Sequence, residues 1–412
     1  MKEKLKGRFS LAFLGNLLEH YDTALFGMLS PLLAPRIFPE HDPLIALALT
    51  YMLLPLSLLT KPLGALFFGN LGDKQGREKA LFISLLGIGA TSFSMAFIPL
   101  EYSLGVLPSF LFCLGKSLQN FFAAGEVIGG SIFILENTKE KKQDILSGLY
   151  GASSIGGQIL ASFGVYILSK YGWMHAGWRF LYLFGGLTVC IAWKIRKIPY
   201  AGSSSYRKVF STDLRKNLWE NRYNLLSIMV CSGFSYATYS IAFLLINGLI
   251  PFISSMPQVD VLKINSYLLC LDLFLLPLFG WIASKVSREI FMLTFSLLTC
   301  FLALPFFTLL EGANTFLLIG IRVACVILGV AFFAPFYAWA KELVAEKSRY
   351  LIISLGYILG AQILGSPTAS IAVWCFKSTG KLVSVAWYWM FLALLSSIVI
   401  WVNIQLKKRV FV

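Results

Sequence analysis

The feature that most constrains the fold of this chain is a series of long apolar runs, each separated from the next by a short polar or glycine-rich stretch. A helix needs about 20 apolar residues to cross the hydrocarbon core of a bilayer. The mean hydropathy of +0.74 agrees with lipid as the main solvent of the chain. We therefore expect an all-α membrane protein with twelve transmembrane helices in its 412 residues, near 10–34, 45–70, 80–99, 105–134, 146–169, 177–195, 224–250, 265–284, 290–310, 316–340, 350–375 and 384–405.

One polar segment, residues 197–223, is longer than the other connections and divides the runs into two sets of six. The division predicts an N-terminal six-helix bundle at residues 1–196, a cytoplasmic linker, and a C-terminal six-helix bundle at residues 224–412. Two such halves are typically related by a pseudo-two-fold axis along the membrane normal, with the substrate site near mid-membrane. A faint repeat supports the division, because GNLGDKQGRE at 69–78 and GWIASKVSRE at 280–289 share an opening glycine and a closing Arg-Glu.

The net charge of +15 comes from small groups of Lys and Arg between the apolar runs, not from one basic patch. This pattern is typical of charge that orients a membrane protein, and it does not indicate a nucleic-acid partner. If the N-terminus is cytoplasmic, most of the 35 Lys and Arg fall in cytoplasmic loops. An even number of helices also keeps Lys407, Lys408 and Arg409 inside, so we expect both termini in the cytoplasm.

Several ionisable side chains lie well inside the predicted helices. A charge in the bilayer is costly unless it is paired or faces a water-filled cavity, so such residues are candidates for substrate and proton binding. The alternative is a buried ion pair that only fixes helix packing. We expect Lys61 and Lys116 to bind substrate, and the acidic residues Glu19, Asp22, Glu126 and Asp272 to carry the coupling proton.

A polar stripe marks the predicted helix at 105–134, where Lys116, Gln119, Ala123 and Glu126 are spaced three, four and three residues apart and share one face. Such a stripe is unfavourable against lipid. This face is therefore expected to line a cavity, with Gln119 as a further substrate-binding residue.

Two carboxylates, Glu19 and Asp22, lie three residues apart and share a face of the first predicted helix. Carboxylates that lie this close disfavour simultaneous ionisation, which suits a proton-carrying site. The intervening His20 points away from both and is expected to be a packed core residue.

Tyrosines supply the other polar candidates of the C-terminal half, and we expect Tyr236, Tyr239 and Tyr357 to meet the substrate. Aromatic residues make up 15% of the chain, so packing or anchoring at the membrane interface is the alternative role for each of them.

The patterns of soluble enzymes are missing from the sequence. It contains no GxxxxGK[ST] phosphate-binding loop, no His/Cys set with metal-ligand spacing, and no Ser/His/Asp candidates at one membrane depth. We therefore expect a transporter that is not an enzyme, with no cofactor or metal and with the proton as its coupling ion.

The loop at residues 69–79, GNLGDKQGREK, resembles the G-x-x-x-D-x-x-G-R-[KR]-[KR] signature of the major facilitator superfamily. Gly69, Asp73, Gly76 and Arg77 match the signature, and the loop lies between the second and third predicted helices. The resemblance implies the twelve-helix major facilitator fold. It also implies that these four residues belong to a cytoplasmic charge network that helps to hold the outward-open state; the alternative is an ordinary basic turn.

Further stretches resemble the metabolite:proton symporters of this superfamily, the group of proline/betaine, α-ketoglutarate, citrate and shikimate carriers. They are GNLLEHYDTALFG (15–27), similar to the GNxxExxD first helix of the group; GKSLQNFFAAGEVIGGSIFILEN (115–137), similar to its [RK]xxQGxxxGGE fourth helix; TKPLGALFFGNLGD (60–73); and GWRF (177–180). The resemblance implies an integral protein of a bacterial cytoplasmic (inner) membrane.

Some positions depart from the pattern of the group. Asn120 and Ala124 replace expected glycines, and Lys61 stands where Arg is usual, which keeps the charge but loses the bidentate fork of Arg. Lys116 is closer to the proline/betaine carriers than to the organic-acid carriers. The sequence ends soon after the last predicted helix, so we expect no osmosensing through a C-terminal coiled coil.

Three functions remain open at the level of the sequence. The leading hypothesis is proton-coupled symport of a small zwitterionic or carboxylate metabolite by alternating access, in a monomer whose partners are the substrate, the proton and the bilayer. An alternative is an organic-anion exchanger or facilitator without proton coupling. A third is a membrane sensor that does not transport.

Overall fold

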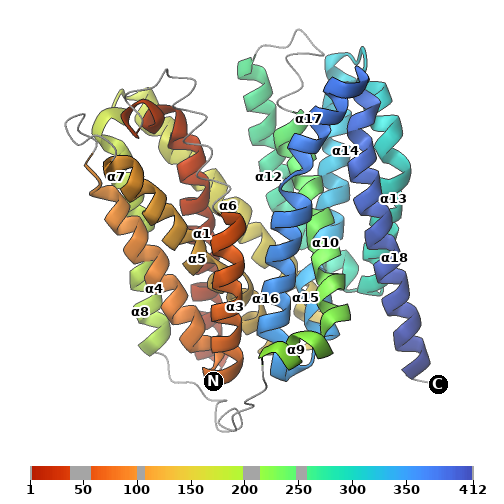
Figure 1. Ribbon diagram of the computed structural model, residues 1–412, viewed down its shortest axis with the longest axis horizontal. Coiled ribbons are helices and arrows are strands. Elements are labelled where there is room, and N and C mark those ends of the chain that lie inside the picture. The colour runs from red at the N-terminus through yellow and green to blue at the C-terminus, as the bar shows by residue number, and fades with distance from the viewer. Residues whose placement is uncertain (1, 38–56, 100–106, 198–213, 247–257, 411–412) are drawn as a thin grey trace. The chain divides into compact units, whose positions relative to one another are not determined.

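The computed structural model describes residues 2–37, 57–99, 107–197, 214–246 and 258–410, and every regular element within these ranges is a helix (Figure 1). Each of the twelve predicted segments contains helical residues. Nine helices of the described part are long and apolar enough to cross a membrane, and residues 177–191 form a shorter apolar stretch. The all-helical membrane fold predicted from the sequence is confirmed. Residues 45–56 of the second predicted helix lie outside the described residues.

The helices of the first part of the chain follow the predicted order. They are α1 (Lys2–Ile37), α3 (Ser57–Gln75), α4 (Arg77–Ala96), α5 (Leu107–Glu136), a 3₁₀ turn (Glu140–Lys142), α6 (Gln143–Lys170), α7 (Met174–Gly185) and α8 (Thr188–Lys197). The sixth predicted segment is thus two short helices instead of one.

The second part begins with α9 (Leu214–Glu220), which lies within the predicted linker. It continues with α10 (Arg222–Ser240), the π-helix η4 (Ile241–Leu245), α12 (Gln258–Ala283), α13 (Arg288–Leu310), α14 (Thr315–Phe333), α15 (Phe336–Leu343), a 3₁₀ turn (Glu346–Ser348), α16 (Arg349–Leu359), the π-helix η6 (Gly360–Gly365), α17 (Thr368–Thr379), a 3₁₀ turn (Leu382–Val385) and α18 (Ala386–Val410).

The chain forms two compact units. Unit 1 comprises Met1–Glu136, Ser153–Asn217 and Glu346–Ser354, and unit 2 comprises Asn137–Ala152, Leu218–Ala345 and Leu355–Val412. The start of α6 therefore belongs to unit 2 and the start of α16 to unit 1. The predicted bundles at 1–196 and 224–412 stay a prediction, and most of the linker between them lies outside the described residues.

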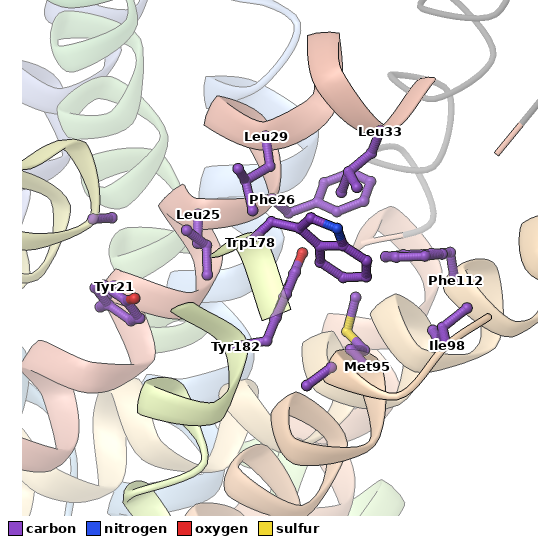
Figure 2. Close-up of a cluster of buried hydrophobic side chains, with 12 residues drawn as sticks. Tyr21, Leu25, Phe26, Leu29, Leu33, Met95, Ile98, Phe112, Trp178 and Tyr182 are labelled. Atoms are coloured by element: carbon purple, nitrogen blue, oxygen red, sulfur yellow. The ribbon is translucent and has the colours of Figure 1, made fainter. Parts of the chain in front are cut away.

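Unit 1 has an aromatic core, shown in Figure 2, in which the Trp178 indole lies beside Phe112 and Tyr182. The ring centroids of Trp178 are 6.1 Å from Phe112 and 6.0 Å from Tyr182. Lipid tails are as apolar as these side chains, so close packing, rather than escape from water, holds the helices together. The GWRF stretch thus supplies the central side chain of this core.

Close helix approach in unit 1 depends on Gly157 of α6. A Cβ atom at this position would overlap the carbonyl oxygen of Leu17 and lie 2.8 Å from the amide nitrogen of Tyr21, both on α1. Glycine lets the two backbones meet, as in other small-residue contacts between membrane helices. This contact fixes α1, which carries two of the predicted proton-binding residues, against α6.

Candidate functional site

A chain of hydrogen bonds connects three helices inside unit 1. The Lys116 ammonium donates to Gln119 Oε1 at 2.8 Å, and Gln119 Nε2 donates to Ser92 Oγ at 2.9 Å. The Ser92 hydroxyl in turn donates to the Asp22 carboxylate. The chain therefore links a lysine and a glutamine on α5, through a serine on α4, to an acid on α1.

All four members of this chain are buried, and Asp22 and Ser92 have no exposed surface. No direct ion pair joins Lys116 to a carboxylate within the described residues, and its ammonium lies 5.1 Å from the centroid of the Phe26 ring. A buried charge without a charged partner is costly in a membrane interior. The acids Asp22 and Glu19 act on the Lys116 ammonium from a distance, so its remaining hydrogens are available to an anionic ligand.

Glu19 belongs to a second group on α1. Its carboxylate accepts a hydrogen bond from Thr23 at 3.0 Å and lies 2.6 Å from His20 Nδ1. The expectation that His20 points away from Glu19 is wrong, because the imidazole turns back along the helix and also reaches the carbonyl of Asn16 at 3.0 Å. Glu19 and Asp22 thus have separate partners, although they share the predicted face.

The second predicted lysine, Lys61 on α3, is half-buried and lies within electrostatic reach of Glu19 and Lys116. The last residue of the α5 stripe, Glu126, is buried, and a Cβ atom built on Gly15 of α1 would lie 3.4 Å from its Oε1. The predicted acids and bases of the first helices are therefore all in unit 1, between α1, α3, α4 and α5.

Among the described residues, the aromatic candidates of unit 2 lie against other aromatic rings. The Tyr357 ring lies 6.0 Å from Tyr337, and the Tyr239 ring lies 4.8 Å from Phe243. Tyr236 is 37% exposed, whereas Asp272 is buried and makes no hydrogen bond or ion pair with the residues that the structure describes. The roles predicted for these four residues stay predictions.

The C-terminal end of α3, which was predicted to be a loop, contacts the start of α16 within unit 1. Asp73 Oδ1 accepts a hydrogen bond from the backbone N–H of Tyr350 at 3.1 Å, and its Oδ2 accepts one from the N–H of Leu351 at 2.9 Å. A carboxylate at a helix N-terminus satisfies amides that have no partner within the helix and complements the helix dipole. Beside it, Arg349 Nη1 lies 2.5 Å from Glu136 Oε1.

Two glycines of the stretch predicted as a loop at 69–79 have distinct structural roles: Gly69 lies within α3 and Gly76 between α3 and α4. A Cβ atom on Gly69 would lie 2.6 Å from the Cα of Leu351, so glycine permits the close approach of α16. Gly76 has φ of 98° just before α4, in the region that favours glycine. Arg77 is the first residue of α4, and its side chain lies outside the described part.

Comparison with known proteins adds three findings. The family model described as "Sugar (and other) transporter" matches residues 9–195. The chain is 26% identical to the glycine betaine/proline/ectoine/pipecolic acid transporter of Dickeya dadantii, with 95% of this chain and 82% of the relative covered. It is also 26% identical to the citrate-proton symporter of Klebsiella pneumoniae, over 91% of this chain and 86% of the relative.

Solved structures share the fold at low sequence identity. The proton:xylose symporter bound to 6-bromo-6-deoxy-D-glucose superposes with a TM-score of 0.74 at 14% identity, covering 97% of this chain and 96% of that one. The fucose:proton symporter of Escherichia coli gives a TM-score of 0.69, also at 14% identity, with coverages of 95% and 97%. The chain has the fold of the major facilitator superfamily.

The resemblance to the metabolite:proton symporter group is confirmed by these relatives. The chain is a multi-pass membrane protein and a secondary transporter, neither an enzyme nor a sensor.

The second copy of the repeat, residues 280–289, also contacts acidic residues through Arg288. Arg288 Nη2 lies 3.2 Å from Asp144 Oδ2, and its Nη1 lies 2.7 Å from Glu342 Oε1, all within unit 2. The first copy uses Asp73 to cap a helix, whereas the second has Ser284 at that place and uses its arginine to bind acids. The faint repeat in the sequence thus marks a contact in each unit.

Three polar residues with buried contacts were not among the site residues predicted from the sequence. Ser92 is the central link of the hydrogen-bonded chain, but a serine in a helix carries no signal of its own. Asn16 donates to Ser153 at 2.7 Å, which also needs a partner distant in sequence to be recognised. Arg322 had the same signal as Lys116, since it is an ionisable residue inside an apolar run.

Proposed function

We propose that this transporter carries a small carboxylate-bearing or zwitterionic metabolite together with a proton, into the cytoplasm of a bacterium across its inner membrane, with both termini cytoplasmic. The observation that supports the proposal best is the hydrogen-bonded chain from Lys116 to Asp22. It connects a cation that has no direct ion pair in the described residues to a buried acid through two neutral side chains.

Lys116 is the residue proposed to bind the substrate carboxylate. Its ammonium has three hydrogens and one hydrogen-bond acceptor, Gln119 Oε1, in the described part of the chain. A substrate carboxylate would add a charge-assisted hydrogen bond in a water-poor site, where such bonds are strong. The nearby Lys61 adds positive potential. The names of the relatives, which include a citrate-proton symporter and proline/betaine transporters, agree with a ligand of this class.

Asp22 is the residue proposed to carry the proton. The hydrogen bonds through Ser92 and Gln119 couple the protonation of Asp22 to Lys116. While Asp22 is ionised, it accepts from Ser92, which accepts from Gln119, whose carbonyl faces Lys116. A protonated Asp22 becomes a donor to Ser92, so the serine donates instead to the amide oxygen of Gln119. The amide then turns its N–H groups toward Lys116, and the lysine needs a new acceptor. Protonation therefore favours binding of the substrate carboxylate, as symport requires.

The test is uptake by the purified full-length chain in proteoliposomes with an imposed inward proton gradient. Glycine betaine, proline, citrate and α-ketoglutarate are supplied separately. At least one should accumulate against its gradient, and Asp22→Asn should abolish accumulation while exchange of labelled for unlabelled substrate persists. A different result would reject proton coupling and support an organic-anion exchanger or facilitator. In that result, the unmodified chain and Asp22→Asn exchange substrate equally well, and accumulation by the unmodified chain does not depend on the proton gradient.

A further inference from the structure

The described part of unit 2 contains a buried cation without a countercharge. Arg322 is the eighth residue of α14 and lies about 10 Å along the helix axis from its first residue. Its side chain has no exposed surface. The residues one turn away on the same helix, from Leu318 to Val326, include no acid that could pair with it.

The guanidinium group makes two contacts, both through Nη2. It donates to Asn265 Oδ1 of α12 at 2.8 Å and to the carbonyl oxygen of Ala242 at 3.4 Å. Ala242 belongs to the π-helix η4, a rare geometry that often marks functional sites. The Nε and Nη1 atoms have no hydrogen-bond partner among the described residues.

Two other arginines with little exposed surface are paired with acids, whereas the half-buried Arg179 and Arg222 contact a backbone carbonyl and an aromatic ring. Arg288 is bound by Asp144 and Glu342, and Arg349 is bound by Glu136. Arg322 is more buried than either and has only neutral acceptors. One amide and one distant carbonyl do not offset the transfer of a full charge from water, so the site lacks an anion.

The acidic residue Asp272 does not supply this anion. It lies seven residues after Asn265 on α12, which places it on the same face but about 10 Å further along the helix. It makes no ion pair in the described part of unit 2. Arg322 and Asp272 therefore do not pair with each other. The Nε and Nη1 atoms of Arg322 stay without a hydrogen-bond partner among the described residues.

We propose that Arg322, positioned by Asn265 and Ala242, forms an anion site in unit 2 that binds a carboxylate. The carboxylate belongs either to the transported metabolite or to a free organic acid. Guanidinium suits this ligand because its planar donors match the two carboxylate oxygens and it always remains charged. The site depends neither on proton coupling nor on the Lys116 site of unit 1.

The test measures the melting temperature of the purified full-length chain in detergent against sodium acetate, with sodium chloride at equal ionic strength as the reference. Acetate should raise the melting temperature saturably in the unmodified chain and in Lys116→Gln. In Arg322→Gln the apparent acetate affinity should fall by about tenfold or more, which is the scale of a lost charge-assisted bond. Arg322→Lys keeps the charge and should lose less.

A second readout separates ligand binding from a structural role. Without acetate, Arg322→Gln should melt at the same or a higher temperature than the unmodified chain, because the substitution removes an unpaired buried charge. A lower melting temperature with an unchanged acetate response would make Arg322 a packing residue and overturn the proposal.

Other outcomes also overturn it. They are no saturable effect of acetate in the unmodified chain, an equal effect of chloride, or an acetate effect that Lys116→Gln abolishes and Arg322→Gln preserves. The last result would leave the proposed transport function standing. If acetate binding needs Arg322, the source of the carboxylate follows from uptake: an increased KM in Arg322→Gln identifies the metabolite, and unchanged uptake identifies a free acid.

Discussion

Ser92 decides whether Lys116 and Asp22 act as one site, because its single hydroxyl connects Gln119 to the carboxylate. The neighbouring Ser94 of α4 differs: it is exposed, and its hydroxyl donates to the carbonyl of Ala90 in its own helix at 2.8 Å. Two serines of the same helix thus provide a direct comparison between a linking hydroxyl and an isolated one.

We predict that Ser92→Ala lowers proton-driven accumulation by about tenfold or more, since hydrogen bonds to charged groups contribute about 1.5–3 kcal/mol. Exchange without a gradient should fall much less, because Lys116 and Asp22 are still present. The measurement is the steady-state accumulation ratio in proteoliposomes. Ser94→Ala is the control and should accumulate substrate normally. Equal accumulation by both variants would show that the hydrogen-bonded chain does not couple proton and substrate.

Of the hydrogen-bonded chain from Lys116 to Asp22, the sequence predicted Lys116, Gln119 and Asp22 as site residues and missed Ser92, for a physical reason. Ionisable residues in apolar runs are conspicuous because their transfer into lipid is costly, which marks Lys116 and Asp22. A serine is tolerated almost anywhere in a helix because it can bond to its own backbone. Its role depends on which side chains lie opposite, as with the 2.9 Å contact from Gln119, and this is a tertiary fact.

At the level of the elements, periodicity and loop signals located the helices well, since backbone groups in lipid must be satisfied within each segment. The predicted helix at 146–169 corresponds to α6 (Gln143–Lys170), and the one at 290–310 to α13 (Arg288–Leu310). The irregular elements were missed. The π-helix η6 lies inside the segment predicted as a regular helix at 350–375. Just before it, the carbonyl of Tyr357 in α16 accepts a hydrogen bond from Ser232 of α10 at 3.1 Å. Hydropathy carries no information about such changes of winding.

Gly69 is the element-level residue whose role can be tested most directly. We predict that Gly69→Ala destabilises the chain by about 1–3 kcal/mol, because the new methyl group would meet the Cα of Leu351 and a backbone atom cannot rotate away. The matched control is Gly320→Ala, also inside a helix, where a Cβ atom meets nothing within 4 Å. The control should be neutral or slightly stabilising, since alanine favours helix more than glycine. Melting temperatures of the two purified variants provide the comparison, and equal values would contradict the close approach of α3 and α16.

For the whole molecule, the relatives and solved structures support the fold that hydropathy predicted. The two-unit partition was not foreseen, because it assigns the start of α6 to unit 2 and the start of α16 to unit 1. Sequence order alone assigns a helix to one half or the other. Only the tertiary contacts, such as Asp73 with the amides of Tyr350 and Leu351, divide a helix between two units.

Orientation in the membrane is the property of the whole molecule that charge predicts. The excess of Lys and Arg in alternate loops favours a cytoplasmic location for those loops. We therefore expect Lys141, exposed in the 3₁₀ turn before α6, to be cytoplasmic and Lys381, exposed after α17, to be external. Lys141→Cys and Lys381→Cys are placed singly in a variant whose seven native cysteines are replaced.

A membrane-impermeant maleimide applied to intact cells should label the cysteine at position 381 and spare the one at 141, which should react only after the membrane is opened. The same pair provides its own control, because both positions are exposed basic residues outside long helices and differ only in the expected side. The reverse pattern would place the loop of Asp73 outside as well, since both loops follow an even number of predicted helices. Labelling of both positions in intact cells would contradict a single orientation set by positive charge.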